Sequence, residues 1–118
     1  MTQSFFVPGR WPSLNALMDR GVWRKVKLKA EWANTVTLFL RTFKIKPMGR
    51  VFIAYEHARF NWAGDPDNYA SAAMKITSDA LVKQGILAGD TFATVVGFSH
   101  AFRLDKKRPG LMVTLEER

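Results

Sequence analysis

The sequence contains no cysteine, which excludes a disulfide framework and any zinc site built on thiolates. Its longest apolar runs are a few residues, far short of the roughly 20 residues that a membrane-spanning helix needs. The first eight residues do not place an apolar stretch after a basic segment, so we expect no signal peptide and no membrane contact. A phosphate-binding glycine loop, an HExxH pair and a GxSxG turn are also missing, which removes several familiar classes of enzyme.

The composition that remains is that of a folded domain. The chain has 118 residues, of which 47% are hydrophobic and 24% charged, and such proportions are typical of globular proteins rather than disordered ones. A length near 100–200 residues corresponds to one domain, so we expect residues 1–118 to form a single unit.

Positive charge is concentrated in the first part of the chain. The net charge is +8, and residues 1–50 account for all of it, with ten basic side chains and two acidic ones, because residues 51–118 carry eight of each. A positive field over half of a small domain suits a polyanion, most often nucleic acid. The alternative is that the charge serves solubility alone.

Hydrophobic periodicity predicts a small mixed sheet with two main helices. Apolar residues recur at helical spacing in two segments and alternate or cluster as in strands in the others. The expected order is strand 4–8, helix 23–43, strand 50–60, helix 68–84, and strands 91–104 and 111–116. Asp67 is placed to cap the second helix, and the turn 105–110 resembles that of a hairpin between the last two strands. The predicted fold class is therefore α/β (α+β), in one domain.

Four acidic residues form the main candidate for chemistry: Asp65, Asp67, Asp79 and Asp90. Asp65 and Asp67 stand two apart in a turn and can direct both carboxylates to one point. Asp90 would return near the start of the second helix only if the strand after it pairs beside strand 50–60. Convergent carboxylates repel one another, and a divalent cation such as Mg²⁺ relieves that repulsion. A phosphodiester held there would be open to metal-assisted hydrolysis.

Three of these residues, Asp65, Asp67 and Asp79, also have a purely structural interpretation. Asp-Pro-Asp-Asn is a good turn and N-cap sequence, and Asp79 lies four residues after Lys75, which predicts an intrahelical ion pair. The two histidines, His57 and His100, are 43 positions apart and have no paired metal-ligand spacing. Glu56 and His57 point to opposite faces of their strand, so at most one of them borders a site.

Taken together, these residues resemble the RusA family of Holliday junction resolvases. The likeness covers most of the chain and rests on the order and spacing of its motifs. These are Val7-Pro8-Gly9-Arg10, Pro12-Ser13 and Asn15 near the start, then Asp65-x-Asp67-Asn68, Lys75, Asp79-Ala80-Leu81, Gly85-Ile86 and Asp90.

The resemblance implies a homodimeric, Mg²⁺-dependent endonuclease, with Mn²⁺ as an alternative ion, that cuts four-way DNA junctions by paired nicks. It implies no small-molecule cofactor and a location in the cytoplasm of a bacterial or phage-infected cell. By position, Asp65, Asp67 and Asp90 would be metal ligands, and Lys75 the catalytic lysine. A metal-activated water would attack a backbone phosphate while Lys75 counters its developing charge.

Three features depart from the family pattern. In one of them, Arg59-Phe60-Asn61-Trp62-Ala63-Gly64, with a single charge, stands where a basic run commonly precedes the acids. Lys75 lies eight residues after Asp67, whereas the family's lysine follows by about one helical turn, a position that Ser71 occupies here. Four extra residues add roughly 400°, so the lysine keeps its face of the helix but moves by about 6 Å. Gly89-Asp90 also stands where the family often has paired aspartates.

DNA contacts are expected from basic side chains, mostly in the first half of the chain. The candidates are Arg10, Lys25, Lys27, Lys29, Lys44, Lys46 and Arg59. Phe60 and Trp62 are candidates either for stacking on unpaired bases or for packing. Two alternatives to the nuclease remain: a degenerate relative that binds branched DNA without cutting it, and a basic architectural DNA-binding protein.

Overall fold

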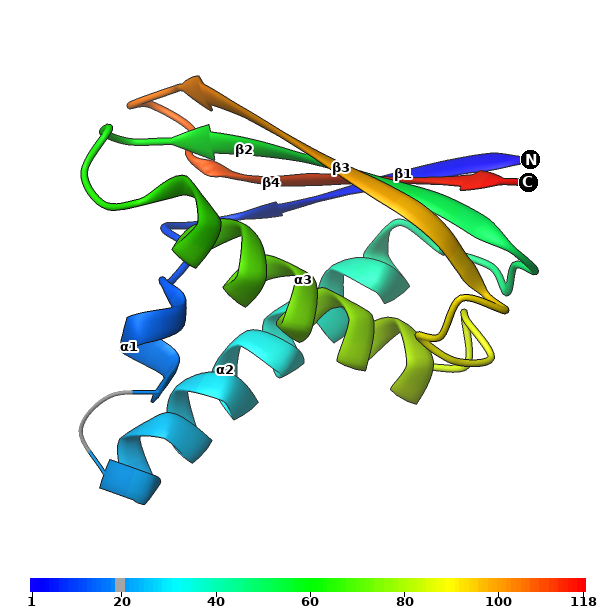
Figure 1. Ribbon diagram of the computed structural model, residues 1–118, viewed down its shortest axis with the longest axis horizontal. Helices are drawn as coiled ribbons and strands as arrows, with labels where there is room; N and C mark the ends of the chain where they lie inside the picture. Colours follow the sequence, from blue (N-terminus) through cyan, green and yellow to red (C-terminus); the bar gives the residue numbers. More distant parts are fainter. Residues whose placement is uncertain (19–20) are drawn as a thin grey trace.

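Four strands form one mixed sheet, and the helices lie against one of its faces (Figure 1). The computed structural model describes the backbone of residues 1–18 and 21–118, and the side chains of all of these except 18 and 21–26. The strands are β1 (Thr2–Pro8), β2 (Val51–Arg59), β3 (Val95–Leu104) and β4 (Gly110–Glu117). The helices of the described residues are α1 (Leu14–Met18), α2 (Gly21–Thr42) and α3 (Pro66–Lys83). The predicted α+β class is confirmed, with the short α1 as an addition.

The strand order is β1-β4-β2-β3. β4 pairs antiparallel with both β1 and β2, whereas β2 pairs parallel with β3. The expected hairpin between the last two strands is therefore wrong, since β2 lies between β3 and β4. Residues 105–110 instead cross the end of β2, where the Asp105 amide donates to the Arg59 carbonyl at 2.6 Å. A turn sequence indicates a reversal of the chain, but it does not specify which strand the returning segment joins.

Helix α3 begins at Pro66, two residues earlier than expected. Proline suits the first helical position because it has no amide hydrogen to satisfy and its φ is already helical. Asp65 is consequently the N-cap residue, with Asp67 in the first turn, and no side chain caps the helix by a hydrogen bond. The predicted capping role of Asp67 is therefore wrong, and its carboxylate is available for other contacts.

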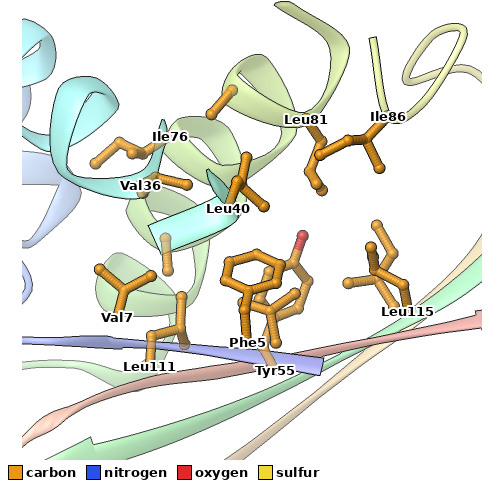
Figure 2. Packing of buried hydrophobic residues seen from close by; sticks show 14 of the residues in the cluster. Phe5, Val7, Val36, Leu40, Tyr55, Ile76, Leu81, Ile86, Leu111 and Leu115 are labelled. Carbon is orange, nitrogen blue, oxygen red and sulfur yellow. The ribbon is translucent and has the colours of Figure 1, made fainter. Parts of the chain in front are cut away.

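The core lies between the helices and the helix side of the sheet (Figure 2). Alternate residues of the strands supply one half of it, and the inward stripes of α2 and α3 supply the other. Its members include Phe5, Val7, Tyr55, Leu111 and Leu115 from the sheet and Val36, Leu40, Ile76 and Leu81 from the helices. Each such side chain contributes about 1.5–3 kcal/mol by leaving water, and together these contacts fix how α3 lies over the sheet. No helix of the described residues is long and apolar enough to cross a membrane.

Leu81→Ala tests this packing. Leu81 is fully buried, so truncation should lower the free energy of unfolding by about 2–5 kcal/mol, because it removes apolar contacts and leaves a cavity. Urea unfolding followed by circular dichroism measures the change. Leu38→Ala is the matched control: Leu38 is 59% exposed, and its loss should change stability by no more than about 0.5 kcal/mol. Equal effects of the two substitutions would contradict the assigned core.

Candidate active site

An open hollow of about 760 Å³ lies between α2, α3 and the start of the β3 segment. Charged and ionisable side chains supply most of its polar lining. They are Asp67, Asp79, Asp90, Lys29, Lys75 and His100. We call this site the acidic hollow.

Helical periodicity brings most of these side chains to one side of α3. Four polar residues recur at every fourth position: Asp67, Ser71, Lys75 and Asp79. Residues four apart lie above one another on a helix, and all four of these line the acidic hollow. The extra turn between Asp67 and Lys75 has therefore kept the lysine on the face of the aspartate, with Ser71 between them.

Asp90 reaches the hollow from the segment that returns to β3. Helix α3 ends at Lys83, and Gly85 then turns the chain with φ +75, a conformation that favours glycine. Strand β3 does pair beside β2, but it begins next to Val51, at the end of the sheet where α3 finishes. Asp90 therefore lies beside the second half of α3, with Met74 and Ser78, rather than near the helix start, although it and Asp67 both line the hollow.

The grouping of the acids differs from the expected one in two respects. Asp65 is exposed and is not among the residues that line the hollow, whereas Asp79 is. The predicted ion pair between Lys75 and Asp79 is wrong: between described residues the ion pairs are Arg103–Asp105 and Arg118–Glu116. Nothing in the spacing had separated Asp79 as a helix-surface residue from Asp79 as a site residue.

The carboxylates of the described part of the chain do not form a ready-made metal centre. No three histidine or acidic side chains among the described residues come close enough together to hold a metal ion. Asp67, Asp79 and Asp90 share a hollow without converging on one point. The assignment of Asp65, Asp67 and Asp90 as ligands therefore stays a prediction.

A basic groove continues from the acidic hollow between α2 and α3. It has a volume of about 750 Å³, and Lys29, Arg41 and Lys83 line it together with Asp79. Lys29 and Asp79 line both sites. Of these basic residues, the sequence had indicated only Lys29, since Arg41 and Lys83 belong to no basic run.

The other predicted DNA contacts are spread over the molecule. Lys27 is exposed on α2, and the side chain of Lys25 lies outside the described residues. Lys44 and Lys46 are exposed beyond the end of α2, where the Lys46 backbone bonds Gln3 of β1. Because β1 and β3 are opposite edges of the sheet, Lys44 and Lys46 lie away from the acidic hollow.

Arg59, one of the predicted DNA contacts, is buried and has a structural role. Its side chain is 7% exposed, and its guanidinium lies 3.6 Å from the centre of the Tyr69 ring. It also donates to the Ala63 carbonyl at 3.1 Å, so it fastens the loop before α3 onto the end of β2. Arg10, which is exposed, lies over the Phe60 ring at 4.2 Å. Phe60 is thus packed between basic side chains.

The same loop requires glycine at position 64. Gly64 has φ +86, and a Cβ there would lie 2.6 Å from the Tyr69 ring. This close approach lets the loop pack on the Tyr69 ring. Arg59, at the end of β2, lies against the same ring. Asp65 and Asp67 follow directly, so their place depends on this packing. Trp62, by contrast, is 61% exposed.

Two histidines that are distant in sequence meet on the helix side of the sheet. The parallel register pairs Tyr55 with His100 and His57 with Phe102, so the histidines are diagonal neighbours. His57 Nε2 and His100 Nδ1 are 2.9 Å apart, and the His100 ring stacks on Tyr55 with centroids 4.7 Å apart. The absence of paired spacing in the sequence had hidden this contact.

Burial controls the protonation of this cluster. Burial, with repulsion from His100 and Arg59, lowers the pKa of His57 to about 4, and burial also lowers the pKa of His100. Both rings are therefore neutral near pH 7, and one donates to the other. Burial raises the pKa of Tyr55 to about 12. Among the described residues, the Tyr55 hydroxyl and His100 Nε2 are buried without a hydrogen-bond partner within 3.5 Å, and the Ser78 side chain interacts only weakly with the Tyr55 hydroxyl.

The chain was compared with models of known protein families and with curated protein sequences, and it matches none of them.

The stability of the protein should fall as the pH drops from about 6.5 to about 4. His57 has its lowered pKa only in the folded state, so the unfolded state binds the extra proton first and is favoured by acid. His57→Gln should flatten this part of the pH profile relative to the original chain. Urea midpoints measured at intervals between pH 4 and pH 7 test this, and parallel profiles for the two proteins would contradict it.

Proposed function

We propose that the protein is a Mg²⁺-dependent endonuclease that cuts four-way DNA junctions by paired nicks. The observation that carries the proposal is that Asp67 and Asp90 line one open hollow together with Lys29 and Lys75. Carboxylates beside lysines suit a phosphodiester, because the lysines bind the phosphate and the acids bind the cation that it needs. The resemblance to the RusA family supports the same reaction.

The donor set of the hollow fits Mg²⁺. This ion prefers oxygen ligands, keeps several of its waters, and is usually held by only one or two carboxylates together with substrate phosphates. Asp67 and Asp90 would hold it, with Asp79 on the same face of α3. When bound there, Mg²⁺ would lower the pKa of a water and offset the charge of the phosphate. A three-ligand protein cage is not required for this.

The protein's own cations then position the DNA. Lys75 and Lys29 line the acidic hollow, and Lys29, Arg41 and Lys83 continue along the α2–α3 groove. In a DNA strand bound along this groove, these basic side chains would neutralise the phosphates as far as the acidic hollow. Lys75 would stabilise the charge that develops on the phosphate during attack.

Two symmetric cuts require two active sites. A homodimer with a two-fold axis would present one acidic hollow to each of two strands, and its two subunits would carry a charge of +16. Such a charge suits a branched DNA, whose phosphates lie close together at the crossover. We place this activity in the cytoplasm of a bacterial or phage-infected cell.

One observation favours a second candidate, a protein that binds junctions without cutting them. The described acidic and histidine side chains do not form a three-ligand group. A chain that kept the basic groove while losing metal binding would retain affinity for branched DNA. An architectural DNA-binding protein would share that affinity and would also bind duplex DNA without cutting it.

A synthetic four-way junction with labelled strands separates these functions. Paired nicks that need Mg²⁺ or Mn²⁺ support the nuclease. Binding to the junction without nicks under either ion supports the second candidate, and equal binding to a duplex of the same length supports the architectural protein.

Asp67→Asn and Asp90→Asn should each abolish nicking while leaving junction affinity equal or higher. Each substitution removes a carboxylate from the cation's ligands and also removes a negative charge that repels phosphate. Glu56→Gln is the matched control, because Glu56 is exposed on the opposite face of the sheet from the helices and should leave nicking unchanged. Gel-based cleavage and mobility shifts provide both measurements. Loss of binding in a folded Asp90→Asn protein would count against the assignment.

Lys83→Ala should weaken junction binding and lower the salt dependence of the affinity. Each phosphate contact contributes about 0.9 to the slope of log affinity against log salt, so the slope should fall by about that amount per subunit. Lys106→Ala is the control, since Lys106 is exposed in the turn between β3 and β4, away from the groove. Fluorescence anisotropy across a salt series measures both slopes, and an equal decrease for the two variants would contradict a specific path along α2 and α3.

A further inference from the structure

A second hollow adjoins the acidic one, between α3 and the first half of β3. Its volume is about 430 Å³, within the range of pockets that hold small molecules. Met74, Ser78, Asp90 and Phe98 line both hollows, so the two are continuous. We call the second one the aromatic hollow.

Most of the residues that line the aromatic hollow are apolar, and Tyr55, Ser78, Asp90 and Thr91 add polar groups to it. Phe92 is 94% exposed and Phe98 53% exposed, although both line this hollow. Exposed aromatic rings of this kind offer flat surfaces on which another ring can stack. Phe98 also meets the His100 ring edge-on, with centroids 5.8 Å apart.

Tyr55 supplies one of these polar groups. Its side chain is 1% exposed, and its hydroxyl rises from β2 on the helix side of the sheet (Figure 2). That hydroxyl is buried and has no hydrogen-bond partner within 3.5 Å among the described residues, although the Ser78 side chain, which lines the same hollow, interacts with it more weakly. A buried polar group without a partner is costly, and a ligand that bonded it would remove the cost. Burial keeps the hydroxyl protonated, so it can both donate and accept.

We propose that the aromatic hollow binds one unstacked nucleobase of the strand whose phosphate lies at the acidic hollow. The base would stack on Phe98 and direct its hydrogen-bonding edge at the Tyr55 hydroxyl. A base and its own phosphate are joined through one sugar, which matches two continuous hollows that share Ser78, Asp90 and Phe98. Enzymes that modify a base accept it in such a pocket, and the cost of extrusion is least for a base that is already unpaired. This inference rests on the proposed function and adds a means of strand selection to it.

A nucleobase fits the hollow better than the surface of a second copy of the chain. An apolar protein surface placed there would leave the Tyr55 hydroxyl unsatisfied, whereas a base edge carries donors and acceptors. The hollow also opens beside Lys29 and Lys75, which attract a nucleotide and repel another basic chain. If the aromatic hollow is instead buried between two subunits, the sedimentation experiment described below will show it.

The test uses four-way junctions that carry 2-aminopurine, one position at a time, next to the crossover. The protein is added without divalent cation so that no strand is cut. At one position, fluorescence should rise several-fold on binding, because the base leaves the stack. Phe98→Ala should weaken junction binding by about fivefold or more, the effect of losing one stacked base, and should reduce the rise. Phe43→Ala is the matched control, since Phe43 is 47% exposed near the end of α2 and lines neither hollow.

Tyr55→Phe provides a second variant, because it keeps the ring in the core and removes only the hydroxyl. It should bind the junction while losing the preference among the four bases at the sensitive position, measured by competition with unlabelled junctions. An unchanged preference would overturn the role of Tyr55. Sedimentation of the same variants follows the subunits: dissociation of a dimer by Phe98→Ala would overturn the proposal and assign this face to the interface.

The outcomes keep this inference separate from the proposed function. Nicking by the original chain with no fluorescence change at any position overturns the base site and leaves the nuclease standing. A fluorescence rise that depends on Phe98, without nicking under Mg²⁺ or Mn²⁺, supports the base site in a protein that only binds junctions. Failure to bind any junction overturns both.

Discussion

The parallel pairing of β2 with β3 is the constraint on which the candidate site depends. This pairing requires α3 to cross from one end of the sheet to the other, so the chain after α3 must return alongside it. Asp90, just before that return, lies beside the second half of α3, and it lines the same open hollow as Asp67 from the helix start. The same register sets His100 against Tyr55 and next to His57. If β3 paired with β4 as a hairpin instead of with β2, His100 would not lie against Tyr55 and His57.

Helix α3 connects the core with the site through its two faces. Its inward stripe, with Ile76 and Leu81, packs on the sheet and on α2, and its outward polar series lines the acidic hollow. The helical repeat explains why an inserted turn is tolerated, because four residues restore the face while moving the side chain along the axis. Changes in core packing would therefore move the carboxylates and the lysine together.

Several polar side chains of this protein are almost fully buried. His57, Arg59 and Tyr55 are all buried. Burial lowers the pKa of His57 and raises the pKa of Tyr55, so both side chains are neutral near pH 7. Arg59 is stabilised by the Tyr69 ring and a backbone carbonyl, and His57 by His100. The Tyr55 hydroxyl lacks such a contact. Buried polar groups without close partners are uncommon in folded proteins, so the Tyr55 hydroxyl is suited to a ligand contact.

Local patterns determined the elements of this fold, because the spacing of apolar residues, Pro66 and Gly85 act within a few neighbouring positions. They also determined that Asp67, Lys75 and Asp79 share a side of α3, since a helix has a fixed repeat. Strand order was decided only in three dimensions: β4 bonds β1 and β2 rather than β3, because every turn sequence is compatible with more than one partner strand. The meeting of His57 with His100, the exclusion of Asp65 from the hollow and the burial of Arg59 follow from that arrangement. Contacts between residues distant in sequence depend on the packing of the whole chain, and no local spacing encodes them.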